Sequence, residues 1–469
     1  MIDTKALRSR ILDLAIQGKL TEQLPSDGTA EELYQQIQAE KQALIKEGKI
    51  KKEKPLPEIS ADEVPFDIPN NWKWTYMGDI FQHNTGKALN SANTDGQLLE
   101  YITTSNVYWD RFELKELKQM YFSDTEIEKC TIKKGDLLIC EGGDIGRSAI
   151  WNNDFEMRIQ NHLHRLRGFF SGLNVKYYYF LMMLYKEKGM IDGRGIGLQG
   201  FSSKRVHNLI VPLPPLAEQK RIVERVEEIF RLLDTIDKAQ EKYSADSQIL
   251  KAKLITAGIQ GKLTKQLPSD GTAEELYQQI QAEKQKLIKE GKLKKEKSLP
   301  PVSPEEVPFE IPENWMWCHL GECITLQSGQ DFKPSDYNAD NIGTPYLTGA
   351  SNIAENGDLI INRWTEKPTC IANTDDVLIV CKGSGYGKIT ICTIDYAHIA
   401  RQFMAVKKSE FIDTKFMKLF LVSKLSVIKN NGQGLIPGID RPSVLNLPFP
   451  LPPLAEQKRI ADVLERALE

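Results

Sequence analysis

The stretch Leu216-Ala-Glu-Gln-Lys-Arg-Ile222 opens a long segment that decides the fold and ends at Gly291-Lys-Leu-Lys-Lys-Glu-Lys297. Both halves of this segment occur twice. Leu454-Ala-Glu-Gln-Lys-Arg-Ile460 repeats the opening, and 17–54 repeats 260–297 with differences only at 22/265, 43/286 and 50/293. One central element is therefore matched by a copy that is divided between the two ends of the chain.

The first part of the segment has the pattern of a coiled-coil helix. Apolar residues recur every seven positions and form one seam, at Ile222, Ile229, Ile236, Tyr243, Leu250 and Ala257. Gln240 and Ser247 interrupt the second row of the seam. A helix over 216–257 would reach roughly 60 Å at about 1.5 Å per residue, which favours a spacer. We expect both chain ends to form its partner, although residues matching 232–243 are missing from the divided copy.

Two stretches with short apolar runs and turn residues flank the central segment, as in mixed α+β domains. Asp136-Leu-Leu-Ile139 in the first matches Asp376-Val-Leu-Ile379 in the second, and 175–185 is a buried-helix candidate. The sequence predicts an α+β fold in which long antiparallel coiled-coil helices separate two mixed domains, with circular pseudo-two-fold symmetry. The predicted regions are a helical region with linker (1–71), a variable domain (72–212), a central helical region with linker (213–314), a second variable domain (315–450) and a C-terminal helix pairing with the central one (451–469).

Composition bounds the class of protein. The chain has 469 residues, 41% of them hydrophobic and 27% charged, and a net charge of −3, which gives no sign of a nucleic-acid partner. No run of eighteen apolar residues predicts a membrane span, and no apolar leader opens the sequence. Seven scattered cysteines favour reduced thiols over disulfides or a zinc site. We expect a cytoplasmic protein.

One glycine-rich stretch resembles a nucleotide-binding loop, but its spacing is wrong. Gly383-Ser-Gly-Tyr-Gly-Lys-Ile-Thr390 is one residue short between its glycines, and Thr390 does not follow the lysine directly. The parallel stretch Gly142-Gly-Asp-Ile-Gly-Arg-Ser148 has no lysine. A structural turn shared by both domains explains them better, with Arg147 and Lys388 exposed for a phosphate or a base.

Other catalytic patterns are missing from the sequence. His162 and His164 alternate as on a strand, but nothing nearby offers a third metal ligand, so a polar surface strand is the preferred interpretation. We find no adenine-methylation motif, no glycine-rich cofactor loop after a strand and no nuclease carboxylate cluster. We therefore expect no catalytic residue and no metal site in this chain.

Loops at corresponding places in the two domains carry side chains suited to DNA. Arg, Lys, Asn and Gln can read base edges, and Ser, Thr and backbone amides can bind phosphates. Taken singly, each loop is also compatible with an ordinary turn. The candidates in the first domain are Thr104, Ser105, Asn106, Tyr108, Arg147, Gln160, Asn161, Gln199, Ser202, Lys204 and Arg205. Those in the second are Ser351, Asn352, Lys388, Arg401, Gln402, Gln433 and Arg441.

Three repeated motifs identify a family. Leu-Pro-Pro-Leu-Ala-Glu-Gln-Lys-Arg closes both variable domains (213–221 and 451–459), Gln-Gly-Lys-Leu-Thr closes both helices (17–21 and 260–264), and Ile-Pro-x-Asn-Trp opens both domains (68–72 and 311–315). With these motifs the chain resembles the specificity subunit of type I restriction–modification enzymes over essentially its full length.

The resemblance implies a DNA-binding function without catalysis. Each variable domain would be a target-recognition domain that reads one half of a bipartite, asymmetric sequence. The helices would set the spacer and dock two modification subunits, which methylate adenine N6 with S-adenosylmethionine. Restriction subunits would then translocate DNA and cleave it with ATP and Mg, so that no cofactor is bound by this chain. A coiled-coil scaffold with two protein-binding domains is the alternative.

Overall fold

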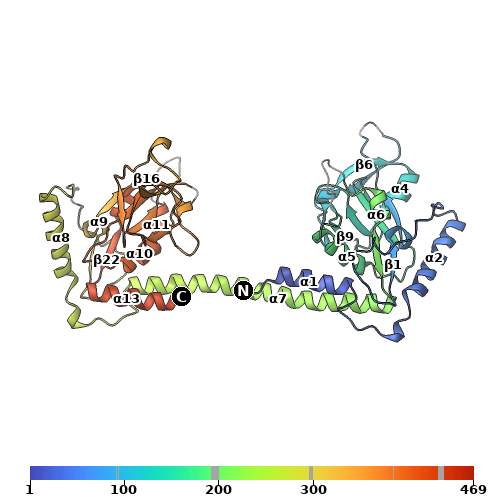
Figure 1. Cartoon of the computed structure of the whole chain (residues 1–469), viewed down its shortest axis with the longest axis horizontal. Helices are drawn as coiled ribbons and strands as arrows, with labels where there is room; N and C mark the ends of the chain where they lie inside the picture. Colours follow the sequence, from blue (N-terminus) through green and yellow to red (C-terminus); the bar gives the residue numbers. More distant parts are fainter. Residues whose placement is uncertain are drawn as a thin grey trace. The chain divides into compact units, whose positions relative to one another are not determined.

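The computed structural model describes residues 1–90, 92, 94–191, 200–294, 299–383, 385–430 and 438–468. The chain divides into two compact units, Met1–Lys242 and Tyr243–Glu469 (Figure 1). Each unit is contiguous in sequence and contains one variable domain together with the helical segments on both sides of it. The finer boundaries inside each unit stay predictions. Gln199 and Gln433 lie outside the described residues.

Unit 1 combines helices with short strands. Its helices are α1 (Thr4–Ile16), α2 (Ala30–Lys46), α3 (Met77–Ile80), α4 (Asp124–Cys130), α5 (Val175–Glu187), α6 (Ser203–His207) and the first part of α7 (Leu216–Ile259). Its strands are β1 (Lys73–Tyr76), β2 (Phe81–Thr85), β3 (Gln97–Ile102), β4 (Val107–Tyr108), β5 (Arg111–Phe112), β6 (Lys118–Phe122), β7 (Thr131–Ile132), β8 (Leu137–Cys140), β9 (Ser148–Ile150), β10 (Met157–Ile159), β11 (Leu163–Gly168) and β12 (Ile210–Leu213).

Unit 2 has a similar order of elements, without counterparts of β4, β5 and α4 among its described residues and with an additional helix, α11. Its helices are the rest of α7, α8 (Ala273–Lys289), α9 (Leu320–Cys323), α10 (Thr414–Ser423), α11 (Leu425–Asn430), α12 (Arg441–Leu445) and α13 (Leu454–Leu468). Its strands are β13 (Met316–His319), β14 (Leu326–Ser328), β15 (Thr344–Leu347), β16 (Trp364–Thr365), β17 (Ile371–Asn373), β18 (Val377–Val380), β19 (Ile389–Ile391), β20 (Tyr396–Ile399), β21 (Phe403–Val406) and β22 (Pro448–Leu451).

The two variable domains share one sheet topology. Unit 1 has four-stranded sheets of order β2-β11-β8-β9 and β6-β3-β10-β7, and unit 2 has β14-β21-β18-β19 and β16-β15-β20-β17. Register agrees as well, because Leu163 faces Cys140 where Phe403 faces Val380. Positions in one domain can therefore be assigned to the other residue by residue.

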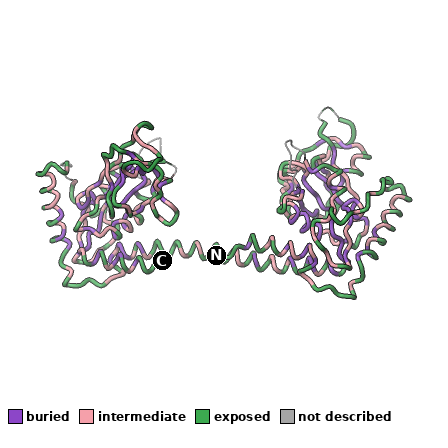
Figure 2. The backbone as a smooth tube through the Cα atoms, in the orientation of Figure 1, coloured by how far each residue is buried: buried purple, intermediate pink, exposed green. Residues whose placement is uncertain are grey.

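Buried residues (purple in Figure 2) are concentrated inside each domain, where the core forms between the central sheet and one helix. In unit 1 this helix is α5, where Tyr177, Tyr178 and Tyr185 are fully buried, which confirms the helix predicted at 175–185. In unit 2 the matching helix is α10, where Phe416 and Phe420 are fully buried. Among the described residues, no helix is both long enough and apolar enough to cross a membrane.

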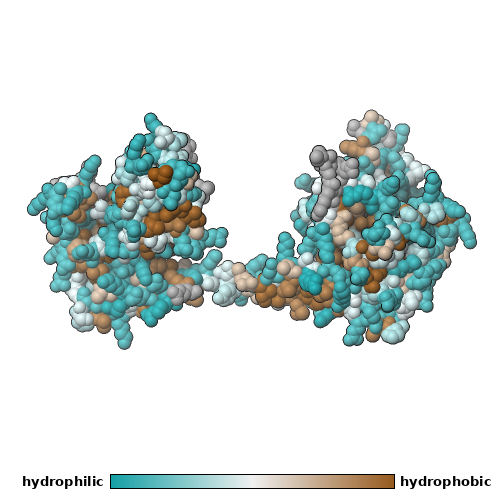
Figure 3. Space-filling model, in the orientation of Figure 1, coloured by the Kyte–Doolittle hydropathy of each residue, from teal (hydrophilic) through white to brown (hydrophobic). Residues whose placement is uncertain are grey.

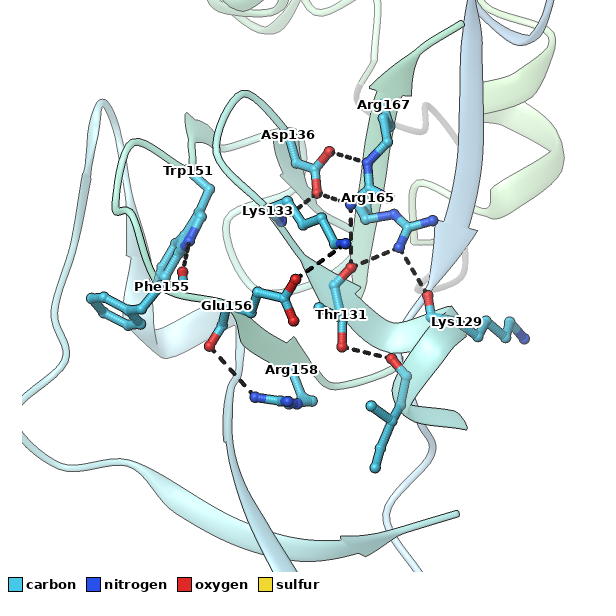
Figure 4. Close-up of polar contacts among 11 residues, drawn as sticks. Lys129, Thr131, Lys133, Asp136, Trp151, Phe155, Glu156, Arg158, Arg165 and Arg167 are labelled. Atoms are coloured by element: carbon cyan, nitrogen blue, oxygen red, sulfur yellow. Dashed lines mark hydrogen bonds and ion pairs between the residues drawn. The ribbon is translucent and has the colours of Figure 1, made fainter. Parts of the chain in front are cut away.

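An ion pair at the same position holds the end of the central sheet in both units. Arg167 of β11 donates to Asp136 through Nε (2.8 Å) and Nη2 (2.6 Å), as Figure 4 shows. At the matching position in unit 2, Lys407, directly after β21, forms an ion pair with Asp376 and donates to the carbonyl of Ile371 (3.0 Å). The Asp-Leu-Leu-Ile and Asp-Val-Leu-Ile motifs thus mark the same framework contact in both domains.

The chain ends pack antiparallel against α7, as the repeat predicts (Figure 1). In unit 1, Arg8 of α1 forms ion pairs with Asp234 (2.7 Å) and Asp237 (3.0 Å) of α7. In unit 2, an added Cβ on Gly258 of α7 would lie 2.8 Å from Leu464 of α13. Each chain end therefore packs against the part of α7 that belongs to its own unit.

The predicted seam of α7 is wrong in its middle. Ile222 and Leu233 are buried against unit 1, but Tyr243 and Leu250 are 73% and 57% exposed. The physical reason is that α1 and α13 contact other parts of α7, so that no helix of the described residues packs over these two seam positions. Leu232 is also 58% exposed, and Figure 3 shows apolar surface along the paired helices α1 and α7.

The three repeated motifs meet at one buried glutamate in each unit. Glu218 is fully buried and accepts hydrogen bonds from Trp72 Nε1 (2.7 Å), Gln23 Nε2 (2.5 Å) and Thr21 Oγ1 (3.3 Å). In unit 2 the same contacts to the buried Glu456 come from Trp315 (2.9 Å), Gln266 (2.8 Å) and Thr264 (3.0 Å). We name each set the motif junction, because it joins the helix end, the domain start and the next helix.

Candidate nucleic-acid interface

Four loop segments converge at one end of the sheets in unit 1. The amide of Glu141, after β8, donates to the carbonyl of His162 (2.9 Å), and the amide of Phe201 donates to the carbonyl of Glu141 (2.9 Å). The amide of Gln160 donates to the carbonyl of Ile102 at the end of β3 (3.0 Å). These contacts bring together the segments around 102–108, 141–147, 160–162 and 200–205, which we call the loop site.

Unit 2 builds the same loop site with other side chains. The amide of Cys381 donates to the carbonyl of Gln402 (2.7 Å), and the amide of Ile439 donates to the carbonyl of Cys381 (2.9 Å). The amide of Ala400 donates to the carbonyl of Leu347 (2.8 Å). The backbone contacts are equivalent while Glu141, Asn161 and His162 are replaced by Cys381, Arg401 and Gln402.

The turns after β8 and β18 also correspond, as predicted from the glycine-rich stretches. Gly146 and Gly387 both have positive φ, at +79° and +92°, and each amide returns to the preceding strand. The side chain of the residue after each glycine, Arg147 or Lys388, donates a hydrogen bond to the first loop segment of its site. Arg147 Nη2 donates to the carbonyl of Thr104 (2.8 Å), and Lys388 Nζ donates to the carbonyl of Ile353 (3.1 Å). The prediction that Arg147 is exposed is wrong, because its side chain is 18% exposed and spans two loops.

Two candidate asparagines hold turns. Asn352 is fully buried, accepts from the amide of Thr348 (2.7 Å) and donates to the carbonyl of Ile360 (2.8 Å). Its side chain is used by this turn and has no exposed surface, and a contact of Asn352 with DNA stays a prediction. Asn106 makes the equivalent contacts, accepting from the amide of Thr103 (2.9 Å) and donating to the carbonyl of Glu113 (2.9 Å).

Two candidate arginines also have partners inside the domains. Arg205 Nη2 donates to the carbonyl of Ile191 (3.0 Å), and Arg441 Nη1 donates to the carbonyl of Leu326 (2.7 Å). Arg205 lies within the short helix α6 and Arg441 begins the short helix α12, and both side chains are partly exposed. These contacts fix their stems and reduce the freedom with which they could reach a ligand.

The remaining candidates lie on the surface of the two loop sites. The exposed ones are Ser105, Tyr108, Ser202, Lys204, Ser351, Lys388, Arg401 and Gln402. The partly exposed ones are Thr104, Gln160 and Asn161. These side chains suit base edges and phosphates, and their contacts with DNA stay predictions.

His164 is a core residue, so the surface strand predicted for it is wrong. It is fully buried on β11 and its Nε2 lies 2.6 Å from the carbonyl of Phe201, while its Nδ1 lies 2.9 Å from His83 Nε2. Because a carbonyl accepts only, His164 Nε2 carries the proton and Nδ1 accepts from His83. Burial lowers the pKa of His83 to about 3 and also lowers the pKa of His164, so both imidazoles are neutral. Their hydrogen bonds hold the fourth loop segment, at Phe201, in place.

Two polar partners in the loop sites were missed by the sequence analysis. Arg111 lies over the Tyr108 ring at 4.3 Å, and Arg147 lies 5.1 Å from the same ring, so that Tyr108 contacts two guanidinium groups. In unit 2, Asp331 accepts from Arg401. Arg111 is only three residues from Tyr108 and pairs with it across β4 and β5, whereas Arg147 and Asp331 are far in sequence from Tyr108 and Arg401, respectively, and reach them only through the fold. Within the described residues, no cluster of three or more His, Cys, Asp or Glu could hold a metal ion.

Comparison with known proteins decides the family. Residues 69–243 and 312–469 match the model of the type I restriction modification DNA specificity domain, so each unit contains one such domain. The chain belongs to this family. It is a DNA specificity subunit with two target-recognition domains, and the specificity subunit is the non-catalytic part of the type I restriction–modification enzyme.

Relatives of this specificity subunit extend over most of its length. The chain is 28% identical to the EcoAI specificity subunit of Escherichia coli, across 99% of this chain and 89% of the relative. It is 31% identical to the EcoEI specificity subunit of Escherichia coli, across 68% of this chain and 62% of the relative.

Solved structures support the fold of the specificity subunit. The crystal structure of the HsdS subunit from Thermoanaerobacter tengcongensis is similar with a TM-score of 0.55 and 18% identity, across 86% of this chain and 90% of that one. A chain from a structure on complex assembly and conformational transition of the type I system gives a TM-score of 0.63 and 18% identity, across 86% and 91%. These likenesses confirm the α+β fold in which long helices separate two mixed domains.

Proposed function

We propose that each unit of this specificity subunit reads one half of a bipartite, asymmetric DNA sequence through its loop site. The observation that carries the proposal is the pair of loop sites, which share backbone contacts but differ in the side chains at the surface. Equivalent scaffolds with different Arg, Asn, Gln and His side chains are what two unlike half-sites require. Backbone phosphates would be bound by the exposed serines, threonines and Lys204.

The partners in this proposal are the other subunits of a type I system. Two modification subunits would dock on the helices, where Leu232, Tyr243, Ile249 and Leu250 are exposed apolar side chains. They would bind S-adenosylmethionine and methylate adenine, and restriction subunits would bind ATP and Mg. The net charge of −3 agrees with this division, because a nearly neutral subunit gains little affinity from phosphates alone.

Replacing one variable domain should change one half-site only. When 72–212 is exchanged for the variable domain of another specificity subunit, the half-site read by unit 2 should remain, because its loop site is built entirely from unit 2. This result is measured by sequencing methylated adenines in a host that has no other adenine methyltransferase. The control exchanges 315–450 and should alter the opposite half. A change of both halves in either chimera would contradict the independence of the two sites.

Lengthening α7 should change the spacer and leave both half-sites intact. Seven residues inserted after Lys242 add about 10 Å of helix and nearly preserve its face. At about 3.4 Å per base pair, the preferred spacer should grow by about three base pairs. Methylated-site sequencing again gives the result. Glu241→Ala, a change at an exposed polar position of the same helix, should leave the spacer unchanged. Methylation at only the original spacing by the extended protein would refute the role of the helix as a ruler.

A further inference from the structure

Arg401 has an unusual arrangement within the loop site of unit 2. It lies between β20 and β21, and its side chain is 71% exposed. Its backbone amide donates to Asp331 Oδ1 (2.9 Å), and its Nε donates to Asp331 Oδ2 (3.0 Å). One carboxylate therefore binds both ends of the arginine, at the backbone and at the guanidinium.

The contact with Asp331 leaves the outer edge of the guanidinium available. In the described part of the chain, no hydrogen bond or ion pair engages the two terminal nitrogens of Arg401. The group is planar and its donors form a fixed fork. When a carboxylate fixes Nε, the terminal nitrogens can still donate side by side, and this geometry matches the O6 and N7 acceptors of guanine in the major groove.

The neighbouring residue on the loop is held differently. Gln402 is exposed, but an added Cβ on Gly349 would lie 2.2 Å from its Oε1, so the Gln402 amide lies against the turn before Asn352. The backbone carbonyl of Gln402 also accepts from the backbone amide of Cys381 (2.7 Å). The side chain of Gln402 therefore lies along the protein surface. The side chain of Arg401 is held by Asp331 through Nε, while its terminal nitrogens face away from that contact.

The equivalent position in unit 1 provides a comparison inside the same chain. The sheet register places Asn161 where unit 2 has Arg401, and Ala88 where unit 2 has Asp331. The amide of Asn161 donates to the backbone carbonyl of Lys87 (2.9 Å) instead of to a side chain. Arginine and aspartate therefore occur together in one unit and are replaced together in the other. A short asparagine has no long stem that needs a carboxylate to orient it.

We propose that Arg401, positioned by Asp331, reads a guanine in the half-site of unit 2. This inference rests on the proposed function and adds one base and its reading residue. Arg401 is the contact residue, and Asp331 is a positioning residue that acts through it. Loss of a bidentate arginine–guanine contact should reduce discrimination at one base pair by about 10- to 100-fold.

The test compares the complete restriction–modification complex with its Arg401 variants, by methylated-site sequencing and by binding to DNA duplexes at several salt concentrations. The wild-type motif should contain a G·C pair in the half-site of unit 2, and Arg401→Ala should accept all bases at that pair alone. Arg401→Lys keeps the charge but not the fork, and should also lose discrimination. The matched control is Lys415→Ala, which removes a 51% exposed charge on α10 of the same unit and should leave the motif unchanged.

Asp331→Ala separates positioning from contact. This variant keeps Arg401 and its charge, so overall binding should stay near the wild-type value while discrimination at the same G·C pair falls. Unchanged discrimination in Asp331→Ala would overturn the positioning role. If Arg401→Ala weakens all duplexes equally and lowers the salt dependence by about one phosphate contact, Arg401 binds a phosphate and the guanine inference is wrong. If the wild-type complex methylates no bipartite site, the proposed function itself fails.

Discussion

Replacing Glu218 with alanine is expected to lower the free energy of unfolding of unit 1 by about 3 kcal/mol, because three buried donors lose one shared acceptor. Glu218 is fully buried and its nearest donor, Gln23 Nε2, lies at 2.5 Å. Trp72 Nε1 at 2.7 Å is the most severely affected, because the indole nitrogen can only donate and its bond to the carboxylate is buried. Calorimetry should show one of two unfolding transitions shifted down by roughly 6 to 12 °C.

The repeat supplies the internal comparison for this prediction. Glu456→Ala removes the same acceptor from Trp315 and Gln266, and should shift the other transition by a similar amount. Glu224→Ala changes a glutamate on the same helix whose side chain is 62% exposed, and should alter stability by less than about 0.5 kcal/mol. A loss below about 1 kcal/mol in Glu218→Ala would show that the motif junction is not what holds the helix end to the domain.

The ionisation of Glu218 adds a pH dependence. Burial raises its pKa above the ordinary value of 4.5, so ionisation opposes folding. This penalty is complete above the folded pKa and disappears as pH falls to the unfolded value. Glu218→Gln cannot ionise, so it should lack the gain in stability that the wild-type residue contributes as pH falls toward about 4.5.

The repeats predicted the architecture correctly because the motif junction uses the same residues twice. Gly18 and Gly261 show why the motif Gln-Gly-Lys-Leu-Thr cannot vary freely. Both have positive φ (+68° and +72°), and a Cβ on either would lie within 2.6 Å of the proline that precedes the motif tryptophan. Backbone conformation and close contact both require glycine here. Such local requirements are visible in one sequence as soon as two copies can be compared.

The candidate site was harder to predict because side-chain type does not reveal partners. Asn352 and Asn106 have the residue type that reads adenine, yet their amides are used by the turns that they build. The role of Asp331 could not be predicted from the sequence, because it is seventy positions from Arg401 and comes close to it only through the pairing of β14 with β21. The loops could be located from the repeat. Which of their side chains are exposed and which are hydrogen-bonded inside the domain depends on the sheet register, which the sequence does not show.

Arg165 is the residue of the variable domains whose loss should be most damaging, although no pattern in the sequence distinguishes it from a surface arginine. It is 2% exposed on β11, and its Nη1 donates to the carbonyls of Thr131 (2.7 Å) and Lys129 (3.1 Å), as Figure 4 shows. Burial lowers its pKa to about 10, so the group remains charged at neutral pH. Arg165→Ala should destabilise unit 1 by about 3 to 4 kcal/mol, because it opens a cavity, removes the charged donor of the Lys129 carbonyl and leaves the Thr131 carbonyl with the longer contact from Arg167 Nη2 (3.5 Å).

Arg165→Met separates these two causes. Methionine fills most of the volume but donates no hydrogen bond, and replacement of a buried charge by an apolar side chain of similar size is often tolerated. The methionine variant should therefore lose less stability than the alanine variant, by about 1 to 2 kcal/mol. Equal losses in both would show that the carbonyl contacts dominate and that packing around the guanidinium contributes little.

Unit 2 shows how the same sheet is held without this arginine. Its equivalent of Arg165 is Ala405, and Lys407 donates to the carbonyl of Ile371, which matches Thr131. Arg165→Ala combined with Arg167→Lys recreates this arrangement in unit 1. If the lysine binds both Asp136 and the Thr131 carbonyl, the double variant should be more stable than the sum of the single losses by about 1 kcal/mol. Strict additivity would mean that the two units satisfy this carbonyl by different routes.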